Sequence, residues 1–148
     1  MSQDNVAIVR RFYELFPDLA AGSPPPALLE LFHPEVRVDQ TRNVFNPASY
    51  EGRDGVARAL EVVGETWESF VLEPERFVES GDHVVVIQSV RARGLGGGVE
   101  VLDRSATLHT LRDGFVVYLA VYPDPDDGLR AASVFSLAAR AGMLNEGS

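Results

Sequence analysis

The sequence lacks several residues and patterns that would narrow its chemistry. It contains no cysteine, which excludes disulfide bonds, thiolate catalysis and cysteine-ligated metal sites. Its three histidines show neither HxH nor HxxxH spacing, so no zinc site is expected. No apolar run approaches the ~18 residues of a membrane-spanning helix, and the amino terminus has no basic-then-apolar signal pattern. We therefore expect a cytoplasmic protein that uses neither a metal nor another cofactor.

Positive charge is also scarce. The chain has 13 basic and 22 acidic residues, a formal net charge of −9. Because a field of this sign repels nucleic acids and anionic membranes, neither is an expected partner. The glycines at 96–98 lead into a strand, whereas a phosphate-binding loop leads into a helix. No nucleophile elbow is present either. What remains is an ordinary globular composition, 45% hydrophobic and 24% charged, in 148 residues that suit one core.

The second half of the sequence predicts three antiparallel strands joined by hairpins. Period-two and β-branched patterns place these strands from Val84 onward, over Val99–Leu111 and over Phe115–Tyr122. Arg112–Gly114 fits a three-residue hairpin loop that closes a Leu111–Phe115 pair. Upstream, the alternation over 70–79 is interrupted by Pro74, which is typical of an edge strand or a bulged strand.

Apolar residues at helical spacing predict four helices, over Asn5–Phe16, Leu28–Phe32, Val56–Trp67 and Leu129–Met143. Pro17 leaves open whether the first helix ends near Leu15 or resumes to Ala21. The second is expected to end at His33-Pro34, since a residue before proline avoids the helical conformation. A short strand over Val36–Asp39 follows from its alternation of apolar and polar residues.

The order of these elements indicates an α+β fold, with helices gathered on one face of a curved antiparallel sheet. Four segments carry a family resemblance between Val6 and Asp124: LLELFHPEVRVD, YEGRDGVARAL, ESGDHVVVIQSVRARG and LHTLRDGFVVYLAVYPD. In this order they resemble the motifs of the SnoaL-like group of the nuclear transport factor two-like superfamily. The resemblance implies a cone-shaped α+β barrel, with one SnoaL-like domain over 1–148, its core at about 6–124 and a carboxyl-terminal helix at about 129–143.

The resemblance also implies a pocket between the concave sheet face and the helices, and a homodimer across the convex face. The superfamily includes ketosteroid isomerases, polyketide cyclases, epoxide hydrolases, dehydratases and proteins that only bind. Two hypotheses therefore stay open for a small, largely apolar organic ligand. The chain is either a cofactor-independent acid–base enzyme or a non-catalytic binding or dimerisation module. An adaptor for partner proteins is a third reading, based on superfamily breadth alone.

Comparison with ketosteroid isomerase assigns sheet faces. It places Thr107 toward the pocket, together with Ile87, Ser89, Arg91 and Arg93. The isomerase uses a carboxylate base, with a tyrosine and a protonated acid as hydrogen-bond donors. This chain departs at all three positions: the tyrosine becomes Phe12 with Tyr13 beside it, the base falls at Gln40 with Asp39 beside it, and the acid becomes Thr107. Steroid-type isomerisation is therefore disfavoured.

The predicted site combines Asp39 as general base with His109 as its acid or orienter, since imidazole titrates near neutrality. Arg91 is expected to hold a substrate carboxylate or enolate. The other predicted substrate-binding residues are Thr107, Tyr13, Tyr50 and Trp67. Structural readings stay open beside these roles: a turn or salt bridge for Asp39, pairing with Asp103 for Arg91, a core position for His109 and Trp67.

The last predicted strand also suggests how the homodimer forms. Tyr118, Ala120 and Tyr122 share one face, opposite to Leu119 and Val121. On a convex sheet face without covering helices, two exposed tyrosines would form an apolar patch that favours a second copy.

Overall fold

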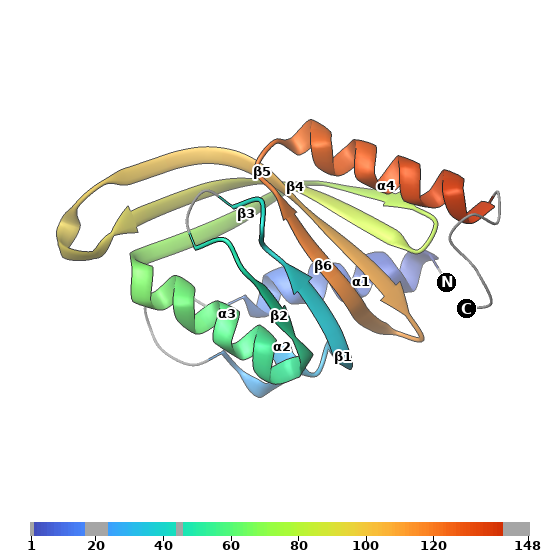
Figure 1. The fold of residues 1–148 in the computed structure, drawn as a ribbon, viewed down its shortest axis with the longest axis horizontal. Coiled ribbons are helices and arrows are strands. Elements are labelled where there is room, and N and C mark those ends of the chain that lie inside the picture. The colour runs from blue at the N-terminus through green and yellow to red at the C-terminus, as the bar shows by residue number, and fades with distance from the viewer. Residues whose placement is uncertain (1, 17–23, 44–45, 141–148) are drawn as a thin grey trace.

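One curved sheet of six strands runs through the protein, with helices on both of its sides (Figure 1). The computed structural model describes residues 2–16, 24–43 and 46–140. The α-helices in this part of the chain are α1 (Ser2–Leu15), α2 (Pro26–Leu29), α3 (Gly52–Thr66) and α4 (Pro125–Arg140). The strands are β1 (Phe32–Asp39), β2 (Ser49–Glu51), β3 (Trp67–Ser80), β4 (His83–Gly94), β5 (Glu100–Arg112) and β6 (Phe115–Tyr122), with a short 3-10 turn, η2 (Leu95–Gly97).

The sheet order is β2-β1-β6-β5-β4-β3, and its centre is antiparallel as predicted. One pairing differs from the fully antiparallel expectation, because β1 runs parallel to β6. Strand β3 is an edge strand with a register shift between Pro74 and Arg76, which confirms the effect expected of that proline.

The hairpin between β5 and β6 is tighter than the sequence predicts. Asp113 and Gly114 both have positive φ angles, 54° and 83°, so a two-residue loop turns the chain. The predicted Leu111–Phe115 pair is therefore wrong, since Arg112 pairs with Phe115 and a bulge follows. Beyond that bulge Thr107 lies opposite Val121. A Leu111–Phe115 pair would place Thr107 opposite Leu119, so the register differs by two residues, and Leu119 and Val121 still share a face with Thr107.

Two predicted helix ends lie in strands instead. Helix α2 begins at Pro26 and ends at Leu29, so His33-Pro34 belongs to β1. Phe32 starts that strand: its backbone pairs with Val116, and its side chain is buried in the core, 1% exposed. His33 precedes Pro34, and a residue before proline favours the extended conformation. Trp67 likewise leaves α3 for β3. The stretch from Pro17 to Ala21 and the predicted helix end at Met143 lie outside the described residues.

The predicted packing of three helices on the concave face is confirmed. Side chains of α1, α2 and α3 form one core with the inner face of the sheet, including Val9, Phe12, Leu28, Val56, Val86 and Leu119. Between these helices and the sheet, part of the concave face borders a hollow that is described below. None of the described helices has the length and apolar character that crossing a membrane would require.

Helix α4 covers part of the convex face, which was predicted to have no covering helix. It lies across the side of the sheet opposite to α1 and α3 (Figure 1) and builds a second core there, in which Ala132 joins Ala120, Tyr122 and Leu108. Its approach is close because Gly128 has no side chain; a Cβ atom there would lie 2.7 Å from the Cβ of Ala106. Tyr122 is therefore only 6% exposed. The expected patch of exposed tyrosines on an uncovered face is wrong.

Candidate functional site

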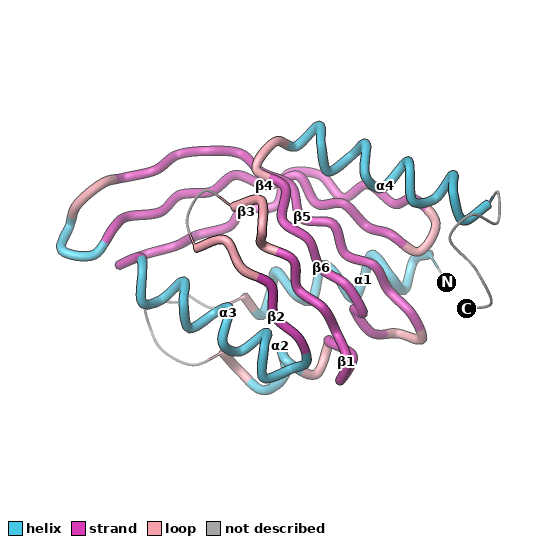
Figure 2. The backbone as a smooth tube through the Cα atoms, viewed as in Figure 1, coloured by secondary structure: helices cyan, strands magenta, loops and turns pink. Residues whose placement is uncertain are grey.

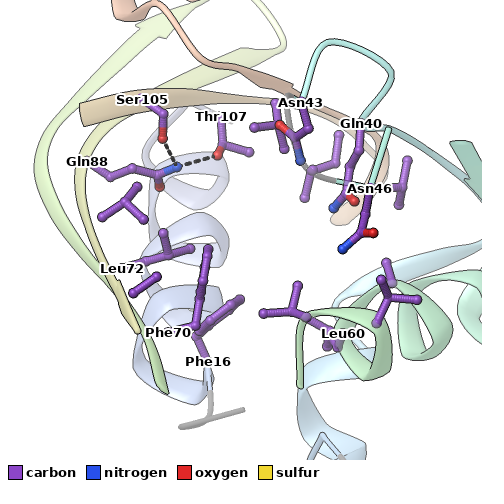
Figure 3. Close-up of a pocket in the computed structure, with 18 of the residues that line it drawn as sticks. Phe16, Gln40, Asn43, Asn46, Leu60, Phe70, Leu72, Gln88, Ser105 and Thr107 are labelled. Carbon is purple, nitrogen blue, oxygen red and sulfur yellow. Dashed lines mark hydrogen bonds between the residues drawn. The ribbon is translucent and has the colours of Figure 1, made fainter. Parts of the chain in front are cut away.

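A cavity of about 230 Å³ lies between the concave face of the sheet and helices α1 and α3 (Figure 3). Most of its lining is apolar and comes from elements far apart in the sequence. Representative wall residues are Phe16 directly after α1, Leu60 and Val63 of α3, and Phe70, Leu72 and Ala92 of the strands. The cavity is thus enclosed by side chains that favour an apolar ligand body.

A hydrogen-bonded group of four side chains forms the inner polar end of this cavity. The Tyr13 hydroxyl donates to Gln88 Oε1 at 2.7 Å. The Gln88 amide nitrogen donates to Thr107 Oγ1 at 2.8 Å and to Ser105 Oγ at 3.1 Å. Gln88, Ser105 and Thr107 line the cavity and are at most 9% exposed. Burial raises the pKa of Tyr13 above its usual range, although the nearby Thr107 hydroxyl opposes this, so Tyr13 remains a donor.

Tyr13→Phe should lower the free energy of unfolding by about 1–3 kcal/mol, because it leaves Gln88 Oε1 buried without its donor. Tyr50→Phe is the matched control, since no described residue hydrogen-bonds to the Tyr50 hydroxyl. It should change stability by less than about 0.5 kcal/mol. Urea denaturation of both variants measures the difference. Equal losses would show that the Tyr13–Gln88 bond contributes nothing.

Neutral amides line the opposite, outer side of the cavity. Gln40, Asn43 and Asn46 face Gln88 across the hollow (Figure 3). The Asn46 amide donates to Thr66 Oγ1 at 2.7 Å. No described residue hydrogen-bonds to the side-chain amides of Gln40 and Asn43, which leaves both free for a ligand. Asp103, which is exposed, is the single ionisable group among the described lining residues.

Three of the predicted substrate-binding residues belong to this region. Thr107 faces the cavity as expected, and Trp67 lines it beside Phe70, with their ring centroids 6.4 Å apart. Tyr13 reaches it through Gln88. Tyr50 instead packs against the core of α-helices and sheet and is not among the lining residues.

Asp39 lies outside the cavity. Val38 and Gln40 line it, and Asp39 between them points to the other side of β1. There its carboxylate accepts hydrogen bonds from Thr41, from Arg42 and from the Tyr118 hydroxyl. Desolvation alone would raise the pKa of Asp39, but the bonds from Thr41 and Arg42 outweigh it and lower the pKa to about 2.

His109 is buried against α1 and is not among the described residues that line the cavity. Its ring makes edge-to-face contacts with Phe12 and Tyr13, at centroid distances of 5.5 and 6.1 Å. Among the described residues, neither of its ring nitrogens has a hydrogen-bond partner. Burial lowers its pKa to about 3, so the ring is neutral at physiological pH. The structure does not bring Asp39 and His109 together at one cavity.

Placing Arg91 on the concave side is wrong. On β4 the cavity is lined by Gln88, Val90 and Ala92, so Arg91 points to the convex side and is exposed. A shift of one residue along a strand exchanges its two faces, which is the physical origin of the error. Asp103, opposite Val90, faces the cavity, so the alternative pairing of Arg91 with Asp103 does not occur either.

Sequence reasoning missed most of the polar residues of the cavity. Gln88 and Ser105 carried a signal, because each is a polar residue at a strand position whose neighbours two residues away face inward. Gln40 carried one as well, because the comparison with ketosteroid isomerase places it at the position of the base, whereas Asn43 and Asn46 carried none, since they lie in an irregular loop. The described residues contain no cluster of His, Cys, Asp or Glu able to hold a metal ion.

Comparison with known families identifies one match. Residues 9–119 match the profile of the SnoaL-like domain. This region contains the second half of α1, helices α2 and α3, and the six strands as far as Leu119. No curated protein sequence matches the chain.

Solved structures share the fold at low sequence identity. An NTF2-like protein of unknown function from Burkholderia pseudomallei is 23% identical, with a TM-score of 0.69 over 86% of this chain and 95% of that one. TerC, co-crystallised with polyporic acid, is 21% identical, with a TM-score of 0.69 over 88% and 98%. A putative SnoaL-like polyketide cyclase from Jannaschia sp. CCS1 is 22% identical, with a TM-score of 0.67 over 89% and 93%. At these identities the likeness establishes the cone-shaped fold.

Proposed function

Because the chain belongs to the SnoaL-like domain family, which includes polyketide cyclases and isomerases, we propose that it binds a small organic molecule in the conical cavity. The molecule is largely apolar, uncharged, and carries oxygen at its ends. One observation carries this proposal: the cavity has apolar walls and neutral hydrogen-bonding groups at both ends.

The apolar walls account for the body of the ligand. Phe16, Leu60, Leu72 and Ala92 converge from helices and strands on one hollow of about 230 Å³. Apolar surface that a ligand buries there contributes ~25 cal/mol per Å². The aromatic rings of Phe70 and Trp67 suit a flat ring system, because offset and edge-to-face contacts add to area burial.

The inner polar end favours a hydrogen-bond acceptor on the ligand. Both hydrogens of the Gln88 amide are used, one by Ser105 and one by Thr107. Ser105 Oγ accepts from Gln88, and no described residue accepts the hydrogen of its own hydroxyl. A carbonyl or ether oxygen at this end can take that hydrogen. At the outer end the amides of Gln40 and Asn43 can both donate and accept.

The charges around the cavity disfavour an acid. An acidic ligand was expected because Arg91 was predicted to hold a substrate carboxylate or enolate, but the Arg91 side chain points away from the cavity. Asp103 places a carboxylate at the cavity, and the whole chain carries a net charge of −9. Transferring an anion into this site without a cation would cost its solvation energy.

A pair of ligands of the same shape tests the proposal. We expect 2-acetylnaphthalene, a neutral ketone, to bind at least about tenfold more tightly than 2-naphthoate, a difference of about 1.4 kcal/mol. Isothermal titration at pH 7.5 measures both dissociation constants. Tighter binding of the carboxylate would show that a cation recognises the ligand and would contradict the proposal.

The three relatives support a small organic ligand but not its neutrality, because the one ligand named among them is an acid. One solved structure contains polyporic acid and another is described as a putative polyketide cyclase. Catalysis with Asp39 as base and His109 as acid stays a prediction for this chain. Binding is the better-supported function, because neither side chain lines the cavity and Asp39 is held by Thr41 and Arg42.

We also propose that the protein is a homodimer, through a different part of the convex face from the one predicted. Strands β4 and β5 extend beyond α4 to the turn at 95–97 (Figure 2). On this extension Val71, Arg91 and Leu102 lie side by side in register, with Val71 48% and Leu102 71% exposed. Two ion pairs flank them, Arg93–Glu100 and Arg104–Glu75, so both signs of charge are present around the apolar contact to pair with a second copy.

Sedimentation velocity at micromolar concentration should therefore show a dimer. Leu102→Asp should convert it to a monomer, because it places a charge at the centre of the apolar contact. Leu95→Asp is the control. Leu95 is also an exposed leucine, but it lies in the turn between β4 and β5, outside the apolar contact. A monomeric wild-type protein would contradict the homodimer.

A further inference from the structure

A second hollow, of about 390 Å³, lies on the convex side of the sheet and belongs to no site described above. One row of cross-strand neighbours forms its floor: Arg37 pairs with Tyr118, Tyr118 with Thr110, and Thr110 with His83. The remaining lining residues are His33, Glu35, Arg112 and Val117. No residue of α4 is among the described residues that line this hollow.

The charge of the hollow is opposite to that of the protein. Two guanidinium groups, Arg37 and Arg112, line it together with one carboxylate, Glu35. The local balance is therefore positive, in a chain whose net charge is −9. Neither arginine forms an ion pair with any described residue. Arg37 instead lies over the Tyr118 ring, 5.9 Å from its centroid. Two unpaired guanidinium groups at one hollow are suited to an oxyanion.

His33 provides a further hydrogen-bond donor for an anion in the hollow. His33 Nδ1 accepts a hydrogen bond from the Glu35 backbone N–H at 3.0 Å. The proton of the neutral ring is therefore on Nε2, which is left as a donor. His83 is already engaged with Thr110, its Nδ1 lying 2.9 Å from Thr110 Oγ1. Tyr118 and Val117 provide an apolar surface beside these donors.

We infer that this hollow binds a small organic anion whose phosphate or carboxylate group lies between Arg37 and Arg112. Val117 and Tyr118 would contact its carbon skeleton. The inference is independent of the conical cavity, since the two sites share no residue and lie on opposite faces of the sheet. A charged lining of this kind is unlike the centre of a protein–protein interface, where charged residues are depleted.

Two anions serve as probes, inorganic phosphate and benzoate, titrated at constant ionic strength with chloride as the balancing ion. Arg37→Gln and Arg112→Gln should each raise the dissociation constant of the bound anion by at least about tenfold, about 1.4 kcal/mol. Arg76→Gln is the matched control, because it removes the same charge from an exposed arginine that pairs with Ile87 on the same face, outside the hollow and outside the proposed dimer contact. It should change the constant by less than about twofold. Glu35→Gln should tighten binding.

Each outcome either supports or overturns the inference that the hollow binds an anion. Tighter binding of phosphate identifies the ligand class as organic phosphates, and tighter binding of benzoate identifies it as carboxylates. Binding of neither anion overturns the inference, as does an equal loss in Arg76→Gln, which would indicate a general charge effect. A change from dimer to monomer in Arg37→Gln without any anion would show that the hollow is a subunit contact. Retained binding of 2-acetylnaphthalene by every variant shows that the fold and the conical cavity are intact.

Discussion

Ala92→Phe should abolish the binding of 2-acetylnaphthalene, with a loss of about 100-fold or more in affinity, about 2.7 kcal/mol. Ala92 is 1% exposed and lines the conical cavity from β4. A phenylalanine ring at this position occupies the space that the ligand ring would take in a hollow of about 230 Å³. The substitution therefore competes with the ligand directly.

Arg91→Phe is the control for this variant, since it introduces the same side chain one residue earlier on the opposite face of the same strand. Its binding should equal that of the wild type. Circular dichroism and urea denaturation show whether Ala92→Phe keeps the fold, and an overpacked site would cost about 1–3 kcal/mol. Full binding by a folded Ala92→Phe protein would mean that the ligand site lies elsewhere.

Acid should destabilise the protein through His109. The ring is 0% exposed, and burial lowers its pKa to about 3. In the unfolded chain it titrates near 6.5. Between these two values the unfolded state binds one proton more than the folded state, so stability falls as the pH falls. The expected slope is about 1.4 kcal/mol per pH unit, and the complete loss about 5 kcal/mol.

His109→Leu should remove this slope, because leucine does not titrate. At pH 7 the variant loses two aromatic contacts but also removes two buried nitrogens without described partners, so its stability should be close to wild type. At pH 4.5 it should be the more stable protein. Urea denaturation at four pH values from 4.5 to 7.5 measures both curves.

The control for the pH series is His83→Gln. Burial lowers the pKa of His83 as well, against the opposing charge of Asp82, so this side chain contributes in the same direction. It is only part-buried, and the variant should keep most of the wild-type slope. Asp39, whose pKa is lowered to about 2, affects stability only below its usual value near 3.8. Parallel curves for wild type and His109→Leu would contradict the account of His109.

Periodicity was enough to predict the layers of this fold. The stripe that contains Val56 and Ala59 predicts a helix with one buried face, and both residues are at most 4% exposed in α3. Pro74 correctly marks an edge strand with a register shift. The residue at which α2 ends could not be predicted from the spacing of apolar residues. Phe32 fits a helical stripe and a buried strand equally well, and its pairing with Val116 decides between them.

The candidate site was harder to predict, because it depends on which face each strand residue occupies. In β4, Val90 and Ala92 alternate with Arg91 and Arg93, and the apolar pair faces inward. That alternation indicates the correct face, and the comparison with a distant enzyme overrode it. In β1, the same rule separates Asp39 from Val38.

The position of helix α4 explains why the predicted patch of exposed tyrosines was wrong. Its existence follows from the sequence, but the side of the sheet that it covers depends on tertiary packing. The contact of Gly128 with Ala106 places it on the convex face. No local pattern of residues predicts that choice, so the exposure expected for Tyr122 could not be corrected from the sequence alone.

The central claim is that the conical cavity binds a neutral, largely apolar molecule, and a crystal structure of the protein with 2-acetylnaphthalene tests it most directly. The predicted result is density for the ring system between Leu60 of α3 and Leu72 of β3, with the ketone oxygen within hydrogen-bond distance of Ser105 Oγ. Density for the ligand outside this cavity, on the convex face beside Arg91 or in the hollow at Arg37, would contradict the claim.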